Sequence, residues 1–308
     1  MTAPLFLDLA NAPDGGVAHW RKAVDGVRIR LAHWVTENAK GTLLLCPGRT
    51  EYIEKYGDSV RDFQKMGLSV VVIDWRGQGL SDRSGANRLV GHVDQFSDFQ
   101  HDLTAMVDYA KDMGLHGDHY LCAHSMGGCI TLRGLMNGLS VKAAAFSAPM
   151  WGIQLSPPLR ATAWSVTAIA NPFAIRDQLA PGAESRSLLE KNHQDRNRLT
   201  TDPKMFAYIL NQLEQMPDFE MAGPSIAWLG TALREMKAVS KLPVPDIPSV
   251  TFLGTDEEIV DPDAIKARVA GWSNGSLEIV DDAKHEILME TPATRARFFT
   301  KVAEVFGL

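Results

Sequence analysis

The sequence predicts an α/β protein built on a doubly wound, mostly parallel sheet. Apolar segments of strand length alternate with segments of helical periodicity, and the segment at 69–77 ends in a glycine turn. The apolar segments are continuous, which is typical of parallel strands buried on both faces. A chain of 308 residues is long enough for one large core that carries an insertion.

The first half of the chain supplies these elements in a βαβ order. Expected strands cover residues 27–35, 41–48, 69–77, 119–123 and 142–148. Expected helices cover residues 56–66 and 99–114, the second with Ser97 as a candidate N-cap, and a further helix follows Ser125.

The pattern of strands and helices stops at Trp151 and resumes after a proline-marked segment at 242–248. The intervening residues are helical, aromatic and charged in character, with ten basic and nine acidic side chains. We therefore expect three parts: residues 1–150 as the first part of the core, 151–245 as a helical lid, and 246–308 as the second part of the core.

Composition narrows the class of protein. A hydrophobic content of 45% with 22% charged residues is ordinary for a soluble globular chain. The net charge of −6 offers no basic surface for nucleic acid. We expect a small-molecule partner and no nucleic acid.

Cysteines and the N-terminus bear on the compartment. Cys46, Cys122 and Cys129 lie in apolar segments without metal-type spacing, which favours buried thiols in a reducing compartment. The first 20 residues lack the basic start of a signal peptide, and the apolar stretch at 161–175 is too interrupted to span a membrane. The expectation is a cytoplasmic protein without a membrane span, for which transient contact with a membrane surface stays open.

Ser125 follows a buried strand and precedes a helix, where a hydroxyl needs an explanation. Ala123 and Gly127 lie two residues away on either side, as the sharp turn of a nucleophile elbow requires, with Ala in place of the first Gly of G-x-S-x-G. The alternative, a serine that caps the following helix, explains the serine but not the small residues beside it. The pattern predicts a nucleophile at Ser125.

A serine nucleophile needs a base and an acid later in the chain. His285 lies in the loop after the last predicted strand, at the carboxyl edge of the sheet where open sheets form their sites. Asp256, in the loop after the preceding strand, is the predicted acid. Glu257, Glu258 and Asp261 share that loop, and Asp261 is the alternative.

Two backbone N–H groups are expected to stabilise the oxyanion. The elbow turns the N–H of Met126 toward the developing charge, and the loop PGRTE after the strand at 41–48 offers that of Arg49. Alternatively, Arg49 only shapes this loop by pairing with Glu51.

A group of histidines and acids at residues 92–102 has a superficial likeness to a metal site. Its members are His92, Asp94, Asp98, His101 and Asp102. Acids near a helix start more often serve capping and the helix dipole, so a solvated helix surface is the expectation and no metal is predicted. His124 is likewise expected to be a packed neighbour of the elbow and not a second base.

At these motifs the sequence resembles the α/β-hydrolase superfamily, and within it the bacterial lysophospholipase and monoacylglycerol lipase branch. The matching segments are PGRTEYIEKY, DWRGQGLSDR, AHSMGG, GTDEEIVD, AKHEILME and, within the insertion, NRLTTDPKMF and GPSIAWL. The resemblance implies the α/β-hydrolase fold and serine esterase chemistry on acylglycerols or lysophospholipids, without a metal or organic cofactor.

The insertion is expected to supply an apolar pocket for an acyl chain. Candidate lining residues are the aromatic and methionine side chains Trp151, Trp164, Phe173, Met205, Phe206, Met216 and Trp228. Several of them could instead form the core of the lid itself. A small-ester carboxylesterase and a prolyl aminopeptidase stay open as alternatives, whereas the complete set of candidate catalytic residues disfavours a non-enzymatic binding module.

Overall fold

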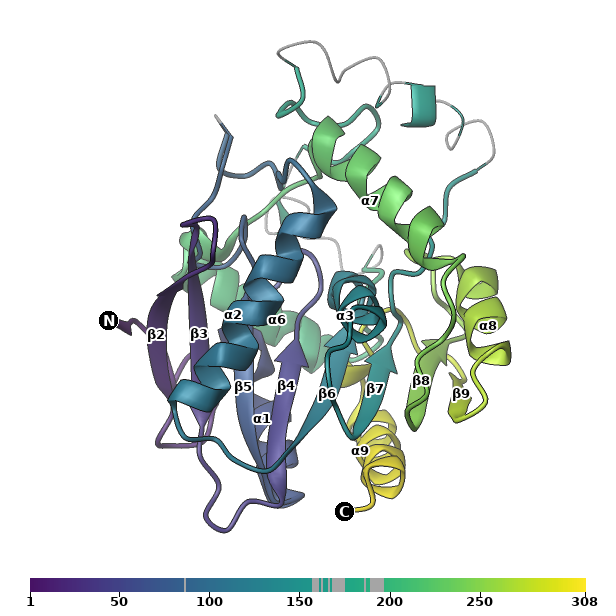
Figure 1. Cartoon of the computed structure of the whole chain (residues 1–308). Helices are drawn as coiled ribbons and strands as arrows, with labels where there is room; N and C mark the ends of the chain where they lie inside the picture. The colour runs from purple at the N-terminus through teal and green to yellow at the C-terminus, as the bar shows by residue number, and fades with distance from the viewer. Residues whose placement is uncertain are drawn as a thin grey trace.

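The computed structural model describes residues 1–85, 87–156, 161, 163–165, 167, 175–185, 187–188 and 197–308. In this part of the chain one nine-stranded sheet has the order β1-β2-β3-β5-β4-β6-β7-β8-β9 (Figure 1). The strands are β1 (Thr2–Ala3), β2 (Val17–Lys22), β3 (Arg28–Trp34), β4 (Gly41–Cys46), β5 (Leu68–Asp74), β6 (Asp118–His124), β7 (Ala143–Ser147), β8 (Ser249–Gly254) and β9 (Gly275–Val280).

The predicted mostly parallel sheet is confirmed. Every pair from β5 to β9 along the sheet is parallel, whereas β1, β2 and β3 add an antiparallel edge. The sequence pattern missed β1 and β2, because β2 reads VAHWRK and its side chains are mostly half-buried or exposed. An edge strand of this kind lacks the continuous apolar run that marks the central strands.

Helices cover both faces of the sheet. They are α1 (Gly57–Lys65), α2 (Phe99–Asp112), α3 (Met126–Met136), α6 (Pro203–Gln215), α7 (Ile226–Val239), α8 (Pro262–Ala270) and α9 (Pro292–Phe306). The core on one face includes α2, α3, α7 and α8, and the core on the other includes α1, α6 and α9 (Figure 1). Successive residues of one strand serve opposite cores, as Leu44 and Leu45 of β4 do.

The start of α2 differs from the prediction. The helix follows a 3-10 turn at Phe96–Asp98, and neither Ser97 nor Asp98 caps it through its side chain. The N–H of Phe96 instead donates to the hydroxyl of Thr231 in α7. A tertiary contact replaces the local cap.

Residues between β7 and β8 include the long helices α6 and α7. In α6, Gln212 donates to the carbonyl oxygens of Leu9 and Glu54, at 2.9 and 3.0 Å, so this helix is fixed to the N-terminal part of the chain. In α7, Ala232 and Met236 join the core on the α2 and α3 face. The predicted boundaries of the lid, 151 and 245, stay a prediction.

A buried ion-pair cluster joins β3, β5 and the 3-10 turn η1 (Ile53–Tyr56). The Arg30 guanidinium lies 2.6 Å from Oε2 of Glu54 and 2.7 Å from Oδ2 of Asp74, and all three side chains are fully buried. Burial alone would lower the pKa of Arg30, but the two carboxylates raise it. Asp74 also accepts the N–H of Ile53, so the cluster fixes the loop that follows β4.

Two further predictions concern the whole chain. Cys46, Cys122 and Cys129 are buried free thiols, as expected. Among the helices that the structure describes, none combines the length and apolar character needed to cross a bilayer.

Candidate active site

Ser125 occupies a strained turn between β6 and α3. Its φ and ψ are 48° and −116°, a conformation that non-glycine residues rarely adopt and that is typical of a nucleophile elbow. A Cβ on Gly127 would lie 2.3 Å from the carbonyl oxygen of Cys46, so the turn packs directly on the end of β4. The Ser125 side chain does not cap α3, which excludes the capping alternative.

The imidazole of His285 lies next to this hydroxyl. Its Nε2 is 2.9 Å from Oγ of Ser125, and its Nδ1 is 2.7 Å from Oε2 of Glu257. The three hydrogen-bonded side chains are shielded from bulk water. Their relative exposures are 7% for Ser125, 4% for His285 and 6% for Glu257. The structure therefore brings the predicted nucleophile and the predicted base together.

The predicted acid is wrong. Asp256 is exposed. The neighbouring Glu257, and not Asp256, is the carboxylate hydrogen-bonded to His285. Asp261, the alternative, accepts the N–H groups of Asp263 and Ala264 as the N-cap of α8.

The physical reason lies in the backbone after β8. Thr255 and Asp256 still donate to the carbonyl oxygens of Val280 and Ala283, which fixes the side of the chain on which each side chain emerges. Asp256 then faces solvent, and the next residue faces the site. Nothing in the sequence of the loop distinguishes two adjacent acids by the side they face.

Glu257 is prepared for this role by its own contacts. Its Oε1 accepts the N–H groups of Ile259 and Val260 at 2.6 and 3.0 Å. Burial opposes ionisation, but the hydrogen bond and charge of His285, with these two N–H groups, lower the pKa of Glu257. The carboxylate is therefore ionised at neutral pH and oriented toward Nδ1.

The loop after β4 lies against the nucleophile. A Cβ on Gly48 would be 3.1 Å from Cβ of Ser125. The loop is held from both sides, because Gly48 donates its N–H to Glu51 while Gln78 donates to the carbonyl oxygen of Gly48 at 2.7 Å. Arg49 follows Gly48 directly in this loop, and its role as an oxyanion donor stays a prediction.

Buried charges surround Glu51 behind this loop. Lys55 Nζ lies 2.7 Å from a carboxylate oxygen of Glu51 and 2.7 Å from one of Glu286, and Tyr56 donates to Glu51 at 2.6 Å. Although burial acts against it, Lys55 and His124 lower the pKa of Glu51 to about 2. The carboxylate of Glu51 is therefore paired with Lys55. This contact excludes the predicted alternative, in which Glu51 pairs with Arg49.

His124 is a packed neighbour of the elbow, as expected. Burial lowers its pKa to about 4, and its Nδ1 lies 2.9 Å from the carbonyl oxygen of Ser147. Glu51, His124 and Glu286 are close enough together to suggest a metal site. The Lys55 ammonium already contacts both carboxylates, so these residues are better suited to their internal cation than to a metal ion.

The group at 92–102 forms the expected solvated helix surface only in part, because Asp94 is exposed and Asp98 and His101 are half-buried, but the other two members are buried. Asp102 is fully buried and lies 2.8 Å from Nη2 of Arg76. His92 is also buried, with its Nδ1 2.9 Å from the hydroxyl of Ser225. The two side chains serve separate contacts, and both were misassigned because their partners are distant in sequence.

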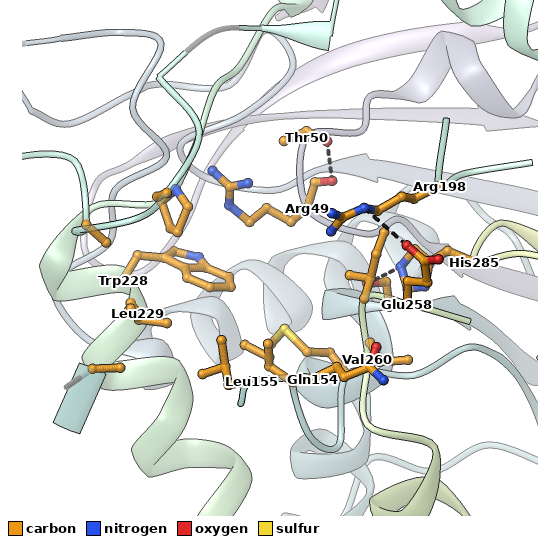
Figure 2. Close-up of a pocket in the computed structure, with 18 of the residues that line it drawn as sticks. Arg49, Thr50, Gln154, Leu155, Arg198, Trp228, Leu229, Glu258, Val260 and His285 are labelled. Atoms are coloured by element: carbon orange, nitrogen blue, oxygen red, sulfur yellow. Dashed lines mark hydrogen bonds and ion pairs between the residues drawn. The ribbon is translucent and has the colours of Figure 1, made fainter. Parts of the chain in front are cut away.

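A cavity of about 430 Å³ opens beside Ser125 and His285 (Figure 2). Much of its lining is apolar and comes from the segment after β7, from α7 and from the loop after β8. These apolar residues include Met150, Ile153, Leu155, Ala163, Ile226, Trp228, Leu229 and Val260. A cavity of this size and character suits the acyl part of an ester.

Of the predicted pocket residues that the structure describes, only Trp228 lines this cavity. Trp151 instead donates to the carbonyl oxygen of Gly128 and packs on Phe146, at 5.2 Å between ring centroids. Phe206 is 2% exposed and lies on the buried face of α6.

The remaining candidates also have other positions. Trp164 is half-buried, with the Lys237 ammonium 5.4 Å from its ring centroid. Met205 and Met216 pack beside the core on the α6 face, and Phe173 lies outside the described residues.

The fold and the hydrogen-bonded chain from Ser125 to Glu257 define a serine hydrolase of the α/β-hydrolase class. The chain belongs to the family described as serine aminopeptidase, S33, whose model matches residues 37–292.

Relatives and solved structures agree with this class. The chain is 29% identical to lysophospholipase L2 of Escherichia coli K12, over 92% of this chain and 85% of the relative. It is 26% identical to a probable lysophospholipase L2 of Haemophilus influenzae, over 84% and 82%. Its fold is similar to a soluble variant of monoglyceride lipase from Saccharomyces cerevisiae, with a TM-score of 0.73, 18% identity and coverage of 94% and 93% of the two chains.

Proposed function

We propose that this protein hydrolyses carboxylic esters of acylglycerols or lysophospholipids through an acyl-enzyme on Ser125. The observation that carries the proposal is the buried chain Ser125–His285–Glu257, which ends at an apolar cavity. Relatives named lysophospholipase L2 and a structural neighbour named monoglyceride lipase support this substrate class.

The geometry provides each step of acyl transfer. His285 Nε2 takes the proton of Ser125 as Oγ attacks the ester carbonyl, and the ionised Glu257 stabilises the imidazolium. The imidazolium then returns the proton to the leaving glycerol oxygen, and the C–O bond breaks. A water molecule, deprotonated by His285, then attacks the acyl-enzyme. The bond from the acyl carbon to Oγ of Ser125 breaks as His285 returns the proton to Oγ, which releases the fatty acid and restores the enzyme.

The N–H groups of Arg49 and Met126 are the proposed oxyanion donors. Met126 is the first residue of α3, where a backbone N–H has no acceptor within the helix. Arg49 belongs to the loop that packs on Ser125. Donors fixed in this way need no reorganisation as charge develops, which is the basis of their catalytic effect.

We also propose that residues 151–245 act as the lid. In support, residues of this segment before α6 and in α7, such as Ala163, Thr167 and Leu229, line the cavity above the nucleophile. Recognition of a peptide amine is less well supported, because the candidate carboxylates Glu184, Glu214, Asp218 and Glu220 do not line the cavity. The remaining candidate, Glu190, lies outside the described residues.

A substrate panel tests the proposal. Wild type and Ser125→Ala are assayed with p-nitrophenyl esters from C2 to C16, monoacylglycerol, lysophosphatidylcholine and proline β-naphthylamide. We expect acylglycerol or lysolipid cleavage, and a loss of ~10³-fold or more in kcat for Ser125→Ala with cooperative unfolding retained. Faster cleavage of the proline amide than of any ester would favour the peptidase, and a maximum at C2 to C4 would favour a small-ester carboxylesterase.

Covalent labelling provides a second readout. A fluorophosphonate should label Ser125 in the wild type and should not label Ser125→Ala. Equal labelling of both proteins would contradict the assignment of the nucleophile.

A further inference from the structure

Arg49 is half-buried, and its guanidinium differs from those of the buried Arg30 and Arg76 in having no carboxylate partner among the described residues. Arg30 is held by Glu54 and Asp74, and Arg76 by Asp25 and Asp102. For the Arg49 guanidinium, the only protein hydrogen bond in the described part of the chain runs from Nη2 to the carbonyl oxygen of Ala222, at 2.6 Å. Its Nε is buried and has no acceptor there.

The surroundings of this guanidinium form a defined site. The group lies 5.3 Å from the ring centroid of Trp228, in the geometry of a cation–π contact. Gly91 makes the space for it, because a Cβ at that position would lie 2.7 Å from Nη2. Gly91 is itself fixed to residues 223–225, since its N–H donates to the carbonyl oxygen of Gly223 and its own carbonyl oxygen accepts the N–H of Ser225.

Arg49 remains a cation in this position. Burial lowers its pKa to about 10, which still leaves it protonated at neutral pH. A half-buried cation without an anion is partly desolvated without compensation, and a bound anion would offset that cost. Nη1 makes no hydrogen bond with the described residues, so this edge of the guanidinium fork can donate to a phosphate or carboxylate oxygen.

The Arg49 guanidinium and the proposed nucleophile belong to one cavity. Arg49 lines the same cavity as Ser125, and its side chain extends from the loop beside the nucleophile toward Trp228, away from His285 (Figure 2). In a lysophospholipid the short glycerol backbone separates the ester from the phosphate. Because Arg49 and Ser125 line the same cavity, one lysophospholipid molecule has room to place its ester at Ser125 and its phosphate toward the guanidinium.

We propose that Arg49 binds the phosphate group of a lysophospholipid headgroup and so selects lysophospholipids over monoacylglycerols. The inference rests on the proposed ester hydrolysis and specifies its substrate. A neutral glycerol headgroup would leave the guanidinium unpaired, whereas a phosphate supplies charge-assisted hydrogen bonds. Arg198, the other arginine of the cavity, is less suited because it is exposed and already paired with Glu258 at 3.3 Å.

The test compares two substrates that share an acyl chain. Hydrolysis of 1-palmitoyl-lysophosphatidylcholine and 1-palmitoylglycerol is measured in the same neutral mixed micelles, and the ratio of their kcat/KM values is the readout. In Arg49→Met we expect this ratio to fall about 10- to 100-fold, mainly through KM of the lysolipid, on the scale of a charge-assisted hydrogen bond. Arg49→Lys should retain part of the preference, because it keeps the charge but loses the fork.

Arg83→Met is the matched control. Arg83 is also an arginine held by backbone carbonyls, with Nη groups 2.8 Å from the carbonyl oxygens of Asp218 and Glu220, just before Ala222, but it does not line the cavity. The substrate ratio should be unchanged in this variant. An equal fall for both substrates in Arg49→Met, or the same change of ratio in Arg83→Met, would overturn the inference and assign Arg49 to loop structure alone.

Two further measurements separate the possible failures. Binding of both lipids to Ser125→Ala, with and without Arg49→Met, tests recognition without turnover, so that failure of the proposed hydrolysis is distinguishable from failure of phosphate binding. Inorganic phosphate is then added as a competitor of monoacylglycerol hydrolysis. Arg49-dependent inhibition by phosphate, without any change of the lipid ratio in Arg49→Met, would identify free phosphate as the ligand and overturn the headgroup assignment.

Discussion

Glu257 accepts a 2.7 Å hydrogen bond on Oε2 from Nδ1 of His285, and both side chains are buried. This contact fixes the tautomer of the imidazole, because Nδ1 carries the proton and Nε2 is left to accept that of Ser125. The other oxygen of Glu257 is bound by two backbone N–H groups of its own loop. The orientation of the base therefore depends on the path of the chain between β8 and α8.

The first prediction concerns the identity of the acid. Glu257→Gln should lower kcat for p-nitrophenyl butyrate by about 10³- to 10⁴-fold, because the amide no longer stabilises the imidazolium and favours the wrong tautomer. Asp256→Asn, one residue earlier and exposed, should change kcat less than about threefold. Steady-state kinetics on the two purified variants decides the matter, and a larger loss in Asp256→Asn would return the role to that residue.

The second prediction concerns the dependence of stability on pH. The folded chain holds the pKa of His124 at about 4 through burial, whereas the unfolded value is about 6.5. Between these values the unfolded chain binds more protons at this position, so the contribution of His124 is fully present above pH ~6.5 and is lost as pH falls toward 4.

The matched variant is His124→Asn, whose amide can still donate to Ser147. From pH 7 to 4 the free energy of unfolding of the wild type should fall by up to about 3 kcal/mol more than that of the variant. Urea denaturation at each pH gives both curves. His19 and His33 titrate in both proteins and cancel in the difference, so parallel curves would contradict the prediction.

The third prediction concerns the ion-pair cluster beneath the active-site loops. Asp74→Asn should destabilise the protein by about 3–5 kcal/mol, because it leaves part of the charge of the buried Arg30 uncompensated. Asp82→Asn is the control, since its partner Arg28 and Asp82 are both 46% exposed and such a pair contributes less than about 1 kcal/mol. Chemical denaturation of both variants measures the two costs, and equal costs would contradict a structural role for the buried pair.

The fourth prediction concerns the acyl pocket. In wild type, kcat/KM for p-nitrophenyl esters should rise with acyl length by up to several-fold per methylene until the cavity is full, as ~0.8 kcal/mol per buried CH₂ allows. Trp228→Ala should flatten this rise with little effect on the acetate ester, because Trp228 lines the cavity. Trp164→Ala, which does not remove a lining residue, should leave the series unchanged. The chain-length series on all three proteins is the measurement, and an unaltered slope in Trp228→Ala would exclude that residue from the acyl path.

The sequence alone predicted the parallel sheet and the positions of the proposed nucleophile and base. These features follow from local patterns, because apolar runs, small residues around Ser125 and the position of His285 after the last strand are consequences of nearby residues. Trp228, in the segment GPSIAWL, was also among the aromatic candidates for the pocket. The sequence did not separate it from the candidates that lie elsewhere.

Tertiary structure alone decided which neighbouring acid faces His285 and that Arg49, which lines the cavity, has no carboxylate partner among the described residues. Asp256 and Glu257 differ by one position, and the hydrogen bonds of Thr255 and Asp256 to the chain after β9 determine the side on which each emerges. Arg49 is unpaired because Glu51, only two residues away, is taken by Lys55 and Tyr56. Such outcomes depend on competition among groups distant in sequence for the same buried volume and charge, which local patterns do not encode.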